Sequence, residues 1–270
     1  MEIKDVSFSY DRKNDQIKHI STTIQAGKIT TIIGPNGSGK STLLSLLAKN
    51  ERVGAGQILL HCKNIMQYSY KRYAQHVAVV HQYNQGPGDL TVEKLVAYGR
   101  LPYRTVLKNQ QIKDEKKIIW ALACTNLTEK RNLPISTLSG GEKQRAWIAM
   151  ALAQDTPYLF LDEPTTFLDL YYQYDILNLL AKLNKTFGLT IVMVLHDINQ
   201  AIQYSDYLMV MQKGVVAYEG TPASVITSSM LEEVYHIQAT IKQDTAHGLY
   251  MLPTGTLSNG RHEVQQHEKV

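Results

Sequence analysis

A nine-residue stretch carries the residue types that phosphate chemistry needs. Residues 34–42 match the pattern G-x-x-x-x-G-K-[ST] at every fixed position. Glycines have no Cβ atom, so the backbone can bend and turn its N–H groups toward phosphate oxygens. We expect Lys40 to reach the β and γ phosphates of a nucleotide and the Ser41 hydroxyl to bind Mg²⁺. The predicted phosphate-binding set is Gly34, Pro35, Asn36, Gly37, Ser38, Gly39, Lys40, Ser41 and Thr42.

The flanking sequence supplies the strand and the helix that such a loop requires. Ile29–Ile33 is an apolar run typical of a buried strand, and apolar residues recur at helical spacing from 43 to 48. A helix that starts directly after the glycines also favours anions at its N-terminus. A chance glycine turn beside an unrelated lysine therefore explains this stretch poorly.

A second glycine-bearing helix start follows about 100 residues later. Ser139 is a good N-cap, and Gly140 and Gly141 again offer bare N–H groups to an anion before the apolar helix 146–153. Glu142 completes this motif. One nucleotide has only one γ phosphate, so we expect this second start to serve a nucleotide held by another copy of the chain.

Two consecutive carboxylates stand at the end of a predicted buried strand. Asp162 and Glu163 directly follow the apolar run Tyr158–Leu161. Carboxylates in such a place are costly unless they meet a cation. We expect Asp162 to hold Mg²⁺, directly or through water, and Glu163 to act as the general base on the attacking water. A surface turn is the alternative, and it fits poorly after four apolar residues.

Two further polar residues end buried strands. Gln82 follows Val77–Val80, and His196 follows Thr190–Leu195. The ends of parallel strands are where ligands bind in such sheets. His196 is therefore predicted to sense the γ phosphate and to position Glu163 and its water. Gln82 is predicted to touch the metal or its water, although the spacing alone leaves an ordinary loop glutamine open.

Tyr10 and Asp169 are the remaining candidates for nucleotide contacts. Tyr10 ends the first predicted strand, one hairpin ahead of the phosphate loop, and its ring can stack on adenine. An ordinary strand-end tyrosine is the alternative. Asp169 lies in the loop that follows Glu163, and we expect it to help hold the facing subunit.

The overall pattern predicts an α/β domain with an inserted helical lobe. Alternating stretches at 2–8 and 17–24 indicate half-buried strands, and Tyr207 to Glu219 reads as a closing hairpin. Between about 83 and 155 the periodicity is helical. From about residue 244 we expect a flexible extension, frayed from 256 onward. Its histidines, at positions 247, 262 and 267, lack regular ligand spacing, so a metal-sensing tail is a minor alternative.

Composition and charge narrow the classes of protein. The chain has 270 residues, of which 44% are apolar and 19% charged, with a net charge of +4 and no block of like charges. This balance gives no support for nucleic-acid binding. No run of 18 or more apolar residues and no signal peptide is evident, so we expect a cytosolic protein. Cys62 and Cys124 are far apart, which predicts neither a disulfide framework nor a zinc site.

Taken together, these motifs resemble those of the ATP-binding cassette (ABC) ATPases over about residues 1–243. The matching motifs are the Walker A loop at 34–42, the Q-loop Gln82, the signature at 138–142, the Walker B strand at 158–163, the D-loop at 166–169 and the switch histidine His196. Glu142 replaces the commoner glutamine of the signature. The resemblance implies a P-loop NTPase core with a mixed β-sheet, an antiparallel β-subdomain and an inserted α-helical subdomain at about 83–155. It also implies ATP, Mg²⁺ and a head-to-tail homodimer.

Within that family the chain is similar to subunits that energise iron-siderophore, haem and cobalamin importers. The matching stretches are 95–102, 144–154, 165–169 and 195–199, while Tyr103 stands where that group often has histidine. The resemblance implies a separate integral-membrane permease, an indirect partnership with a substrate-binding protein, and a peripheral location on the cytoplasmic face of the membrane. A ferric siderophore is the expected cargo.

Several alternatives differ in sequence features. A haem, cobalamin or other transporter cassette is the nearest, because a cassette touches ATP and the permease but never the cargo. An exporter cassette would lack a neighbouring substrate-binding protein. Soluble cassettes of translation usually carry two cassettes in one chain, and those of DNA repair insert long coiled coils; neither feature is present. A phosphate-loop kinase leaves the stretch 138–142 unexplained.

Overall fold

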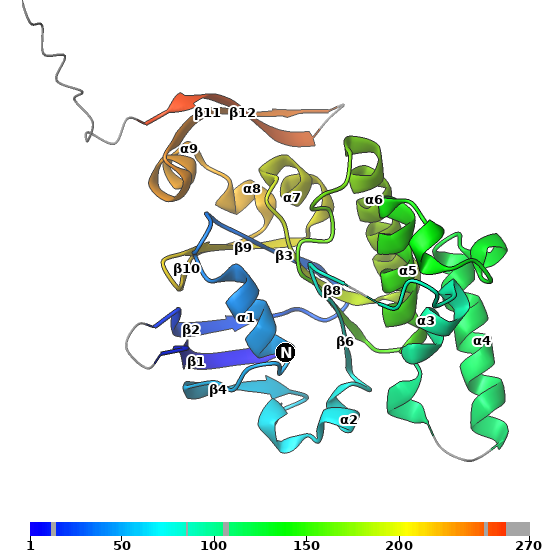
Figure 1. Cartoon of the computed structure of the whole chain (residues 1–270). Coiled ribbons are helices and arrows are strands. Elements are labelled where there is room, and N and C mark those ends of the chain that lie inside the picture. Colours follow the sequence, from blue (N-terminus) through cyan, green and yellow to red (C-terminus); the bar gives the residue numbers. More distant parts are fainter. Residues whose placement is uncertain (12–14, 85, 105–107, 246–247, 258–270) are drawn as a thin grey trace, which may run out of the picture.

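The computed structural model describes residues 1–11, 15–84, 86–104, 108–245 and 248–257, and the side chains of 108 and 109 are outside this description. A six-stranded sheet forms its centre, in the order β10-β9-β3-β8-β7-β6 (Figure 1). Its strands are β3 (Ile29–Ile33), β6 (Val77–Val80), β7 (Tyr158–Leu161), β8 (Thr190–Val194), β9 (Tyr207–Gln212) and β10 (Val215–Gly220).

Parallel pairing places the chemically important strand ends at one edge of this sheet. β3, β6, β7, β8 and β9 are parallel, and only β10 is antiparallel to its neighbour. Ile32 pairs with Val194, and Leu161 pairs with both Met193 and Val80, so the carboxyl ends of these strands are level. All residues of β3, β7 and β8 are buried, as expected for parallel strands covered on both faces.

A smaller antiparallel sheet covers one side of this core, in the order β2-β1-β4-β5. Its strands are β1 (Glu2–Phe8), β2 (Ile17–Thr23), β4 (Ala55–Leu60) and β5 (Lys63–Asn64). Their buried apolar residues share one hydrophobic cluster with helix α1 (Lys40–Leu47), which sits between the two sheets in Figure 1. The short η1 (Ile65–Gln67) and α2 (Tyr70–Tyr73) follow β5. The two predicted N-terminal strands and the antiparallel subdomain are thus observed.

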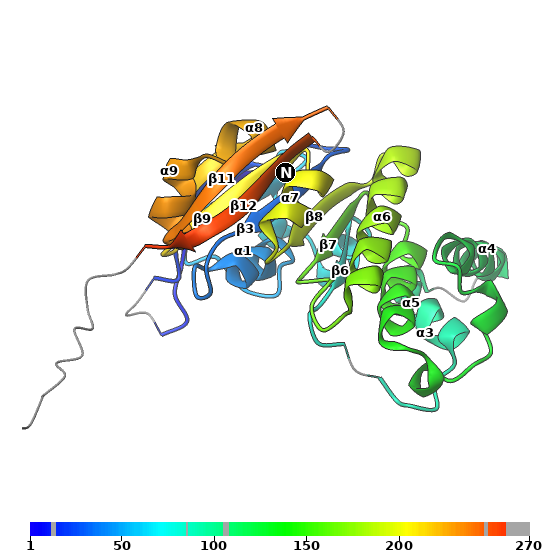
Figure 2. The same cartoon turned by 90° about the horizontal axis from the view of Figure 1, so that it is seen from above.

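The helical lobe stands apart from the small sheet, at the far side of the core in Figures 1 and 2. It contains α3 (Val92–Tyr98), η2 (Leu101–Tyr103), α4 (Lys108–Cys124), η3 (Thr128–Lys130), η4 (Ile135–Thr137) and α5 (Gly140–Ala153). The described part of this lobe has no named strand, only a single bridge between Thr91 and Pro134. Buried Arg100 donates to Asp114 Oδ1 and to the Ala153 carbonyl, both at 2.8 Å, and so ties its helices together.

The remaining helices cover the other face of the central sheet. They are α6 (Leu170–Phe187), α7 (Ile198–Tyr204), α8 (Pro222–Val225), α9 (Ser228–Met230) and the π-helical η5 (Leu231–Tyr235). α6 has a buried stripe at Ile176, Leu177, Leu180 and Leu183, which is the i, i+4, i+7 spacing of an amphipathic helix. Gly188 ends it at φ +65°, a left-handed conformation that glycine adopts without strain. No helix in the described part of the chain combines the length and the apolarity of a membrane span.

The C-terminal segment corrects the sequence prediction. A flexible extension was expected from residue 244, but β11 (Ile237–Asp244) and β12 (Gly248–Thr256) form a two-stranded antiparallel sheet. The polar composition concealed alternating apolar residues, of which Met251 is buried and Ile237, Ile241 and Leu249 pack against the main core. The frayed end was expected from 256 onward, and residues 258–270 lie outside the described part of the chain. His247, His262 and His267 also lie outside it.

One glycine in the helical lobe gives a test of this packing. A Cβ on Gly99 would lie 2.0 Å from the carbonyl oxygen of Met150 in α5, whereas a Cβ on Gly88 would meet Ser136 at an ordinary 3.6 Å. We expect Gly99→Ala to lower the free energy of unfolding by about 1–3 kcal/mol, because α3 must move away from α5. Gly88→Ala is the control. Urea denaturation of both variants measures the difference, and equal stability would contradict the close approach of α3 to α5.

Candidate active site

The glycine-rich loop between β3 and α1 adopts a backbone that other residues resist. Gly34 has φ +147°, and a Cβ there would lie 2.2 Å from the carbonyl oxygen of Met211. Gly39 has φ +103°, with a Cβ position 2.9 Å from the carbonyl oxygen of Gln16. Both glycines are therefore required by sterics as well as by φ. The loop is packed against β9 and the small sheet, which holds its amides in place.

Lys40 lies inside this loop rather than in solvent. Its ammonium donates to the carbonyl oxygens of Gly34 at 2.9 Å and Pro35 at 3.1 Å, and the residue is buried. Burial lowers the pKa of the Lys40 ammonium, while the nearby charges of Glu163 and Asp162 oppose that shift. The cation is thus held at the base of the loop and faces the two carboxylates of the β7 end.

Ser41 and Asp162 come together as the predicted metal ligands should. The Ser41 hydroxyl donates to Asp162 Oδ1 at 3.0 Å across 121 positions of the sequence. Burial raises the pKa of the Asp162 carboxyl most, and the hydrogen bond from Ser41 opposes this. Among the described residues no group of three or more His, Cys, Asp and Glu side chains is arranged to hold a metal ion by itself. One carboxylate with one hydroxyl suits Mg²⁺, which keeps waters and takes its other ligands from phosphates.

Two features show that the loop fits a phosphate group. The Ser38 hydroxyl is buried and has no hydrogen-bond partner among the described atoms. Unpartnered buried hydroxyls are uncommon, and a phosphate oxygen would satisfy this one. Beside the loop, a cavity of about 250 Å³ is lined by Ser41, Thr42, Asp162 and Tyr10. The predicted metal ligands and the predicted base-stacking ring therefore border one space.

Glu163 is held by side chains from three directions. Its Oε2 accepts from Gln82 Nε2 at 2.6 Å and from the Thr166 hydroxyl at 3.0 Å, and its Oε1 lies 2.6 Å from His196 Nε2. The Glu163 side chain is only 11% exposed, and its backbone has φ +51°. Left-handed φ is uncommon for a residue that is not glycine, and it turns the carboxylate toward these partners.

The sheet order explains why these residues meet. β7, which carries Glu163, lies between β6, which carries Gln82, and β8, which carries His196. The sequence predicted Gln82 beside the metal or its water, whereas its amide here binds Glu163, so a metal contact of Gln82 stays a prediction. Thr166 was not predicted to contact Glu163. The only signal was its hydroxyl three residues after the carboxylate.

The signature residues form a separate group in the same chain. The Ser139 side chain caps α5 by accepting from the Glu142 N–H, and the Ser139 N–H donates back to Glu142 Oε2 at 3.0 Å. Lys130 pairs with the other oxygen of Glu142 and holds its pKa below the ordinary value. The polar contacts described for these residues stay at the α5 start, and none joins them to the phosphate loop.

Close packing links the signature to the D-loop. A Cβ on Gly141 would lie 2.3 Å from the ring of Tyr172, and one on Gly140 would lie 3.6 Å from Leu168. Asp169 caps α6 by accepting from the Tyr172 N–H at 3.2 Å. Its predicted contact with a facing subunit stays a prediction. The α5 glycines thus keep their positions relative to the loop that follows Glu163.

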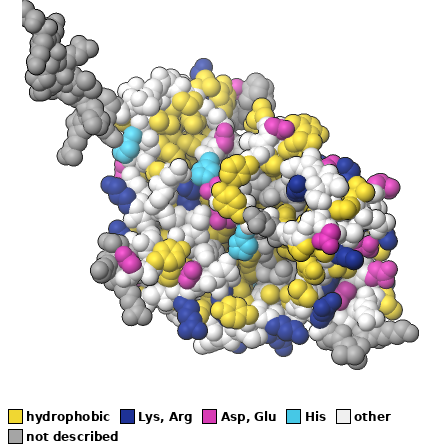
Figure 3. Space-filling view, in the orientation of Figure 1, with side chains coloured by type: hydrophobic (Ala, Val, Ile, Leu, Met, Phe, Trp, Pro, Cys, Tyr) yellow, Lys and Arg dark blue, Asp and Glu magenta, His cyan; other side chains and the backbone are white. Residues whose placement is uncertain are grey.

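Tyr10 is exposed and oriented by a neighbouring ring. Its side chain is 60% exposed, and its ring meets Phe8 edge to face with centroids 4.7 Å apart. Tyr10 lines the cavity described above, and its stacking on adenine stays a prediction. In Figure 3 acidic, basic and histidine side chains are interspersed over this view, and no single sign of charge dominates it.

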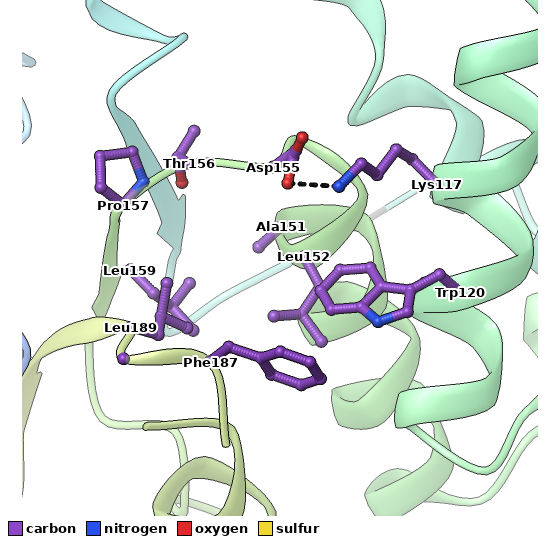
Figure 4. A pocket seen from close by; sticks show the side chains of 11 residues that line it. Lys117, Trp120, Ala151, Leu152, Asp155, Thr156, Pro157, Leu159, Phe187 and Leu189 are labelled. Carbon is purple, nitrogen blue, oxygen red and sulfur yellow. Dashed lines mark hydrogen bonds and ion pairs between the residues drawn. The ribbon is translucent and has the colours of Figure 1, made fainter. Parts of the chain in front are cut away.

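A larger cavity of about 420 Å³ lies elsewhere, at the seam between the helical lobe and the core (Figure 4). Trp120 and Phe187 form part of its wall, and Lys117 pairs with Asp155 at 2.7 Å on its rim. It contains none of the predicted site residues. The smaller cavity bordered by Ser41 and Asp162 is therefore the candidate active site, because predicted site residues line that cavity.

The fold and the site together define a phosphate-loop nucleotide-binding protein with a cassette-type helical lobe. Comparison with family models matches residues 17–166 to the ABC transporter family. Iron(3+)-hydroxamate import ATP-binding protein FhuC of Bacillus subtilis is 46% identical over 228 residues, which cover 84% of this chain and 85% of that protein. Petrobactin import ATP-binding protein FpuD of Bacillus anthracis is 41% identical over 98% of this chain and 97% of its own length.

Ferric enterobactin transport ATP-binding protein FepC of Escherichia coli is 39% identical, over 86% of this chain and 85% of that protein. Among solved structures, cbiO1 from Clostridium perfringens superposes with a TM-score of 0.74 at 29% identity, covering 86% of this chain and 92% of that one. The post-hydrolysis dimer of the cassette MJ0796 bound to ADP and Pi gives 0.70 at 28% identity, with coverages of 82% and 98%. The chain belongs to the ABC transporter family and is an ATPase of that family.

Ser41 gives a direct test of the predicted metal site. We expect Ser41→Ala to weaken binding of a fluorescent ATP analogue in the presence of Mg²⁺ by about tenfold, equal to about 1.4 kcal/mol. Without Mg²⁺ the affinity should match that of the unaltered protein, because the hydroxyl acts through the metal. Ser228→Ala, at the exposed start of α9 and outside this cavity, is the control. An equal loss with and without Mg²⁺ would show that Ser41 contacts the nucleotide itself.

Proposed function

We propose that this chain is the ATP-hydrolysing subunit of an importer that takes up an iron complex, most directly a ferric siderophore. The observation that carries the catalytic part is the meeting of Ser41 with Asp162, and of Glu163 with Gln82 and His196, at one sheet edge. The cargo is supported by relatives 39–46% identical to this chain, whose names specify import of iron(3+)-hydroxamate, import of petrobactin and transport of ferric enterobactin.

The residues divide into binding and hydrolytic roles. The loop amides and Lys40 hold the phosphates, and Tyr10 stacks on the base. Ser41 and Asp162 would hold Mg²⁺, which when bound would neutralise phosphate charge. Glu163 accepts a proton from the attacking water, for which one of its oxygens must exchange a present partner for that water. His196, already 2.6 Å from Glu163, orients that carboxylate and senses the γ phosphate.

The signature residues complete the site from a second copy. Within one chain, no described polar contact joins the start of α5 to the phosphate loop. Ser139, Gly140 and Gly141 nevertheless form a helix N-terminus that suits an anion. Two copies arranged head to tail would give each nucleotide the loop of one chain and the signature of the other, with Asp169 at the boundary. The γ phosphate contacts both copies in this arrangement, so its loss on hydrolysis lets the two copies separate.

The transport partners follow from the same architecture. A separate integral-membrane permease carries the transport pathway in this proposal, which is supported by the relatives named as ATP-binding proteins of import or transport systems. The helical lobe, linked to the site through Gln82, transmits movement to that permease. The subunit then lies peripherally on the cytoplasmic face of the membrane. A substrate-binding protein on the other side delivers the cargo.

Glu163→Gln separates binding from hydrolysis. The amide keeps the size of the side chain but cannot accept a proton, so we expect turnover to fall by about a hundredfold or more while ATP affinity is retained. With ATP and Mg²⁺ this variant should accumulate as a dimer in size-exclusion chromatography. Glu129→Gln, on an exposed turn of the helical lobe, is the control. Turnover of Glu163→Gln at the rate of the unaltered protein would contradict its role as the general base.

Growth on defined iron sources tests the cargo. A strain without this chain should fail to grow when one ferric siderophore is its sole iron source, because uptake of that complex has no energy supply. It should grow normally on free iron salts at high concentration. Restored growth on reintroducing the chain, and none with Glu163→Gln, would link the defect to hydrolysis. A defect confined to haem or cobalamin would favour the alternative importers.

A further inference from the structure

Helix α7 is too short to fix its own orientation. It spans seven residues, Ile198–Tyr204, and begins directly after His196 and its N-cap Asp197. Helices below about twelve residues are marginal by themselves, so packing and side-chain contacts must hold this one. The Asp197 carboxylate accepts from the Gln200 N–H at 2.8 Å, which fixes the first turn but not the direction of the helix. The direction of α7 matters because His196 lies only two residues before its first residue, so a tilt of α7 would move the backbone that carries His196.

Asn199, in the first turn of α7, makes two hydrogen bonds with one residue of the C-terminal hairpin. Its Nδ2 donates to the Met251 carbonyl at 3.1 Å, and its Oδ1 accepts from the Met251 N–H at 2.9 Å. The side-chain amide thus pairs with the backbone of β12 as a neighbouring strand would. A paired contact of this kind fixes both distance and orientation, which a single hydrogen bond does not.

The hairpin needs this contact as much as α7 does. An isolated two-stranded hairpin is at best marginally stable in water. β11 and β12 form their own sheet, separate from the central one, and lie outside α7, α8 and α9 (Figures 1 and 2). The Met251 side chain is only 7% exposed and enters the main hydrophobic core, so the residue gripped by Asn199 is also the buried anchor of β12.

A second contact holds α7 from the opposite direction. Gln200 is 3% exposed, and its Nε2 donates to Gln173 Oε1 of α6 at 2.7 Å. Gln173 in turn donates to the Leu168 carbonyl of the D-loop at 2.9 Å. α7 is therefore fastened to the D-loop side by Gln200 and to the hairpin by Asn199. His196 precedes both contacts in the sequence and reaches Glu163 at 2.6 Å.

We infer that Asn199 is a positioning residue for hydrolysis: by docking the C-terminal hairpin on α7, it holds His196 against Glu163. The hairpin is thus a structural support of the catalytic centre rather than an appendage. This inference rests on the proposed roles of His196 and Glu163. It assigns Asn199 no contact with nucleotide or metal, since both of its described side-chain partners belong to Met251.

Substitution of Asn199 tests the inference against a control in the same helix. We expect Asn199→Ala to lower kcat for ATP about tenfold, since small displacements of catalytic groups have effects of this size. The KM for ATP should stay within about twofold, because the phosphate loop is untouched. Asn199→Asp keeps the acceptor for the Met251 N–H and should lose less than Asn199→Ala. Gln203→Ala, exposed on α7, should behave as the unaltered protein.

Hydrogen exchange reports the docking without reference to activity. In Asn199→Ala the amides of β12, including Met251, and those of α7 should exchange faster, while those of α1 should not change. If Asn199→Ala fails to fold, Asn199→Asp carries the same comparison. Faster exchange of β12 with an unchanged kcat would overturn the inference, because the hairpin would then be loosened without any effect on the position of His196.

A double variant separates this inference from the proposed function. If Asn199 acts through His196, adding Asn199→Ala to His196→Ala should cause no further loss of kcat. Equal, additive losses would overturn the inference while leaving the role of His196 intact. Unaltered turnover of His196→Ala by itself would instead remove the proposed role of His196, and the inference with it.

Discussion

The arrangement of the site depends on one carboxylate whose two oxygens are already shared among three side chains. Glu163 leaves β7 with a left-handed backbone and meets Gln82, Thr166 and His196. A carboxylate that is so little exposed needs hydrogen-bond partners, and here the two neighbouring strands supply them from both sides. The order β6-β7-β8 does this, because it sets Gln82 and His196 on either side of Glu163. The parallel register then keeps the three strand ends level, so the side chains meet without long connecting loops.

The same carboxylate connects parts of the molecule that are distant in sequence. Gln82 leads toward the helical lobe, Thr166 begins the D-loop that packs on the α5 glycines, and His196 begins the segment that docks the C-terminal hairpin. Lys40 and Ser41 follow β3, which lies next to β8 on the side opposite β7. A change at the phosphates can therefore reach the lobe, the signature and the hairpin through contacts with a single residue. In the proposed transporter subunit, these contacts would be the route by which hydrolysis causes movement.

Sequence patterns predicted the strands, the inserted lobe and the residues of the sheet edge because each depends on local periodicity and on a motif of fixed spacing. They placed His196 beside Glu163, which it meets at 2.6 Å, but they did not predict the contacts of Gln82 and Thr166 with Glu163. Gln82 was placed near a metal, whereas its amide binds Glu163, a choice made by rotamers after the strands have paired. The pairing of β11 with β12 was missed because polar residues dominate that segment, and its few apolar residues gain stability only against α7 and the core. Packing of a hairpin on helices that are distant in sequence cannot be recognised from the composition of the hairpin alone.

Mixing two inactive variants measures most directly whether two copies share each nucleotide. Lys40→Ala removes the phosphate-binding cation, and Ser139→Arg blocks the signature, so neither variant should hydrolyse ATP alone. In a mixed dimer, one site combines the intact Lys40 of one chain with the intact Ser139 of the other. The account predicts that mixing the two proteins restores ATP hydrolysis, with a rate that depends on the ratio of the variants. No recovery at any ratio, with both variants folded and able to associate, would contradict it.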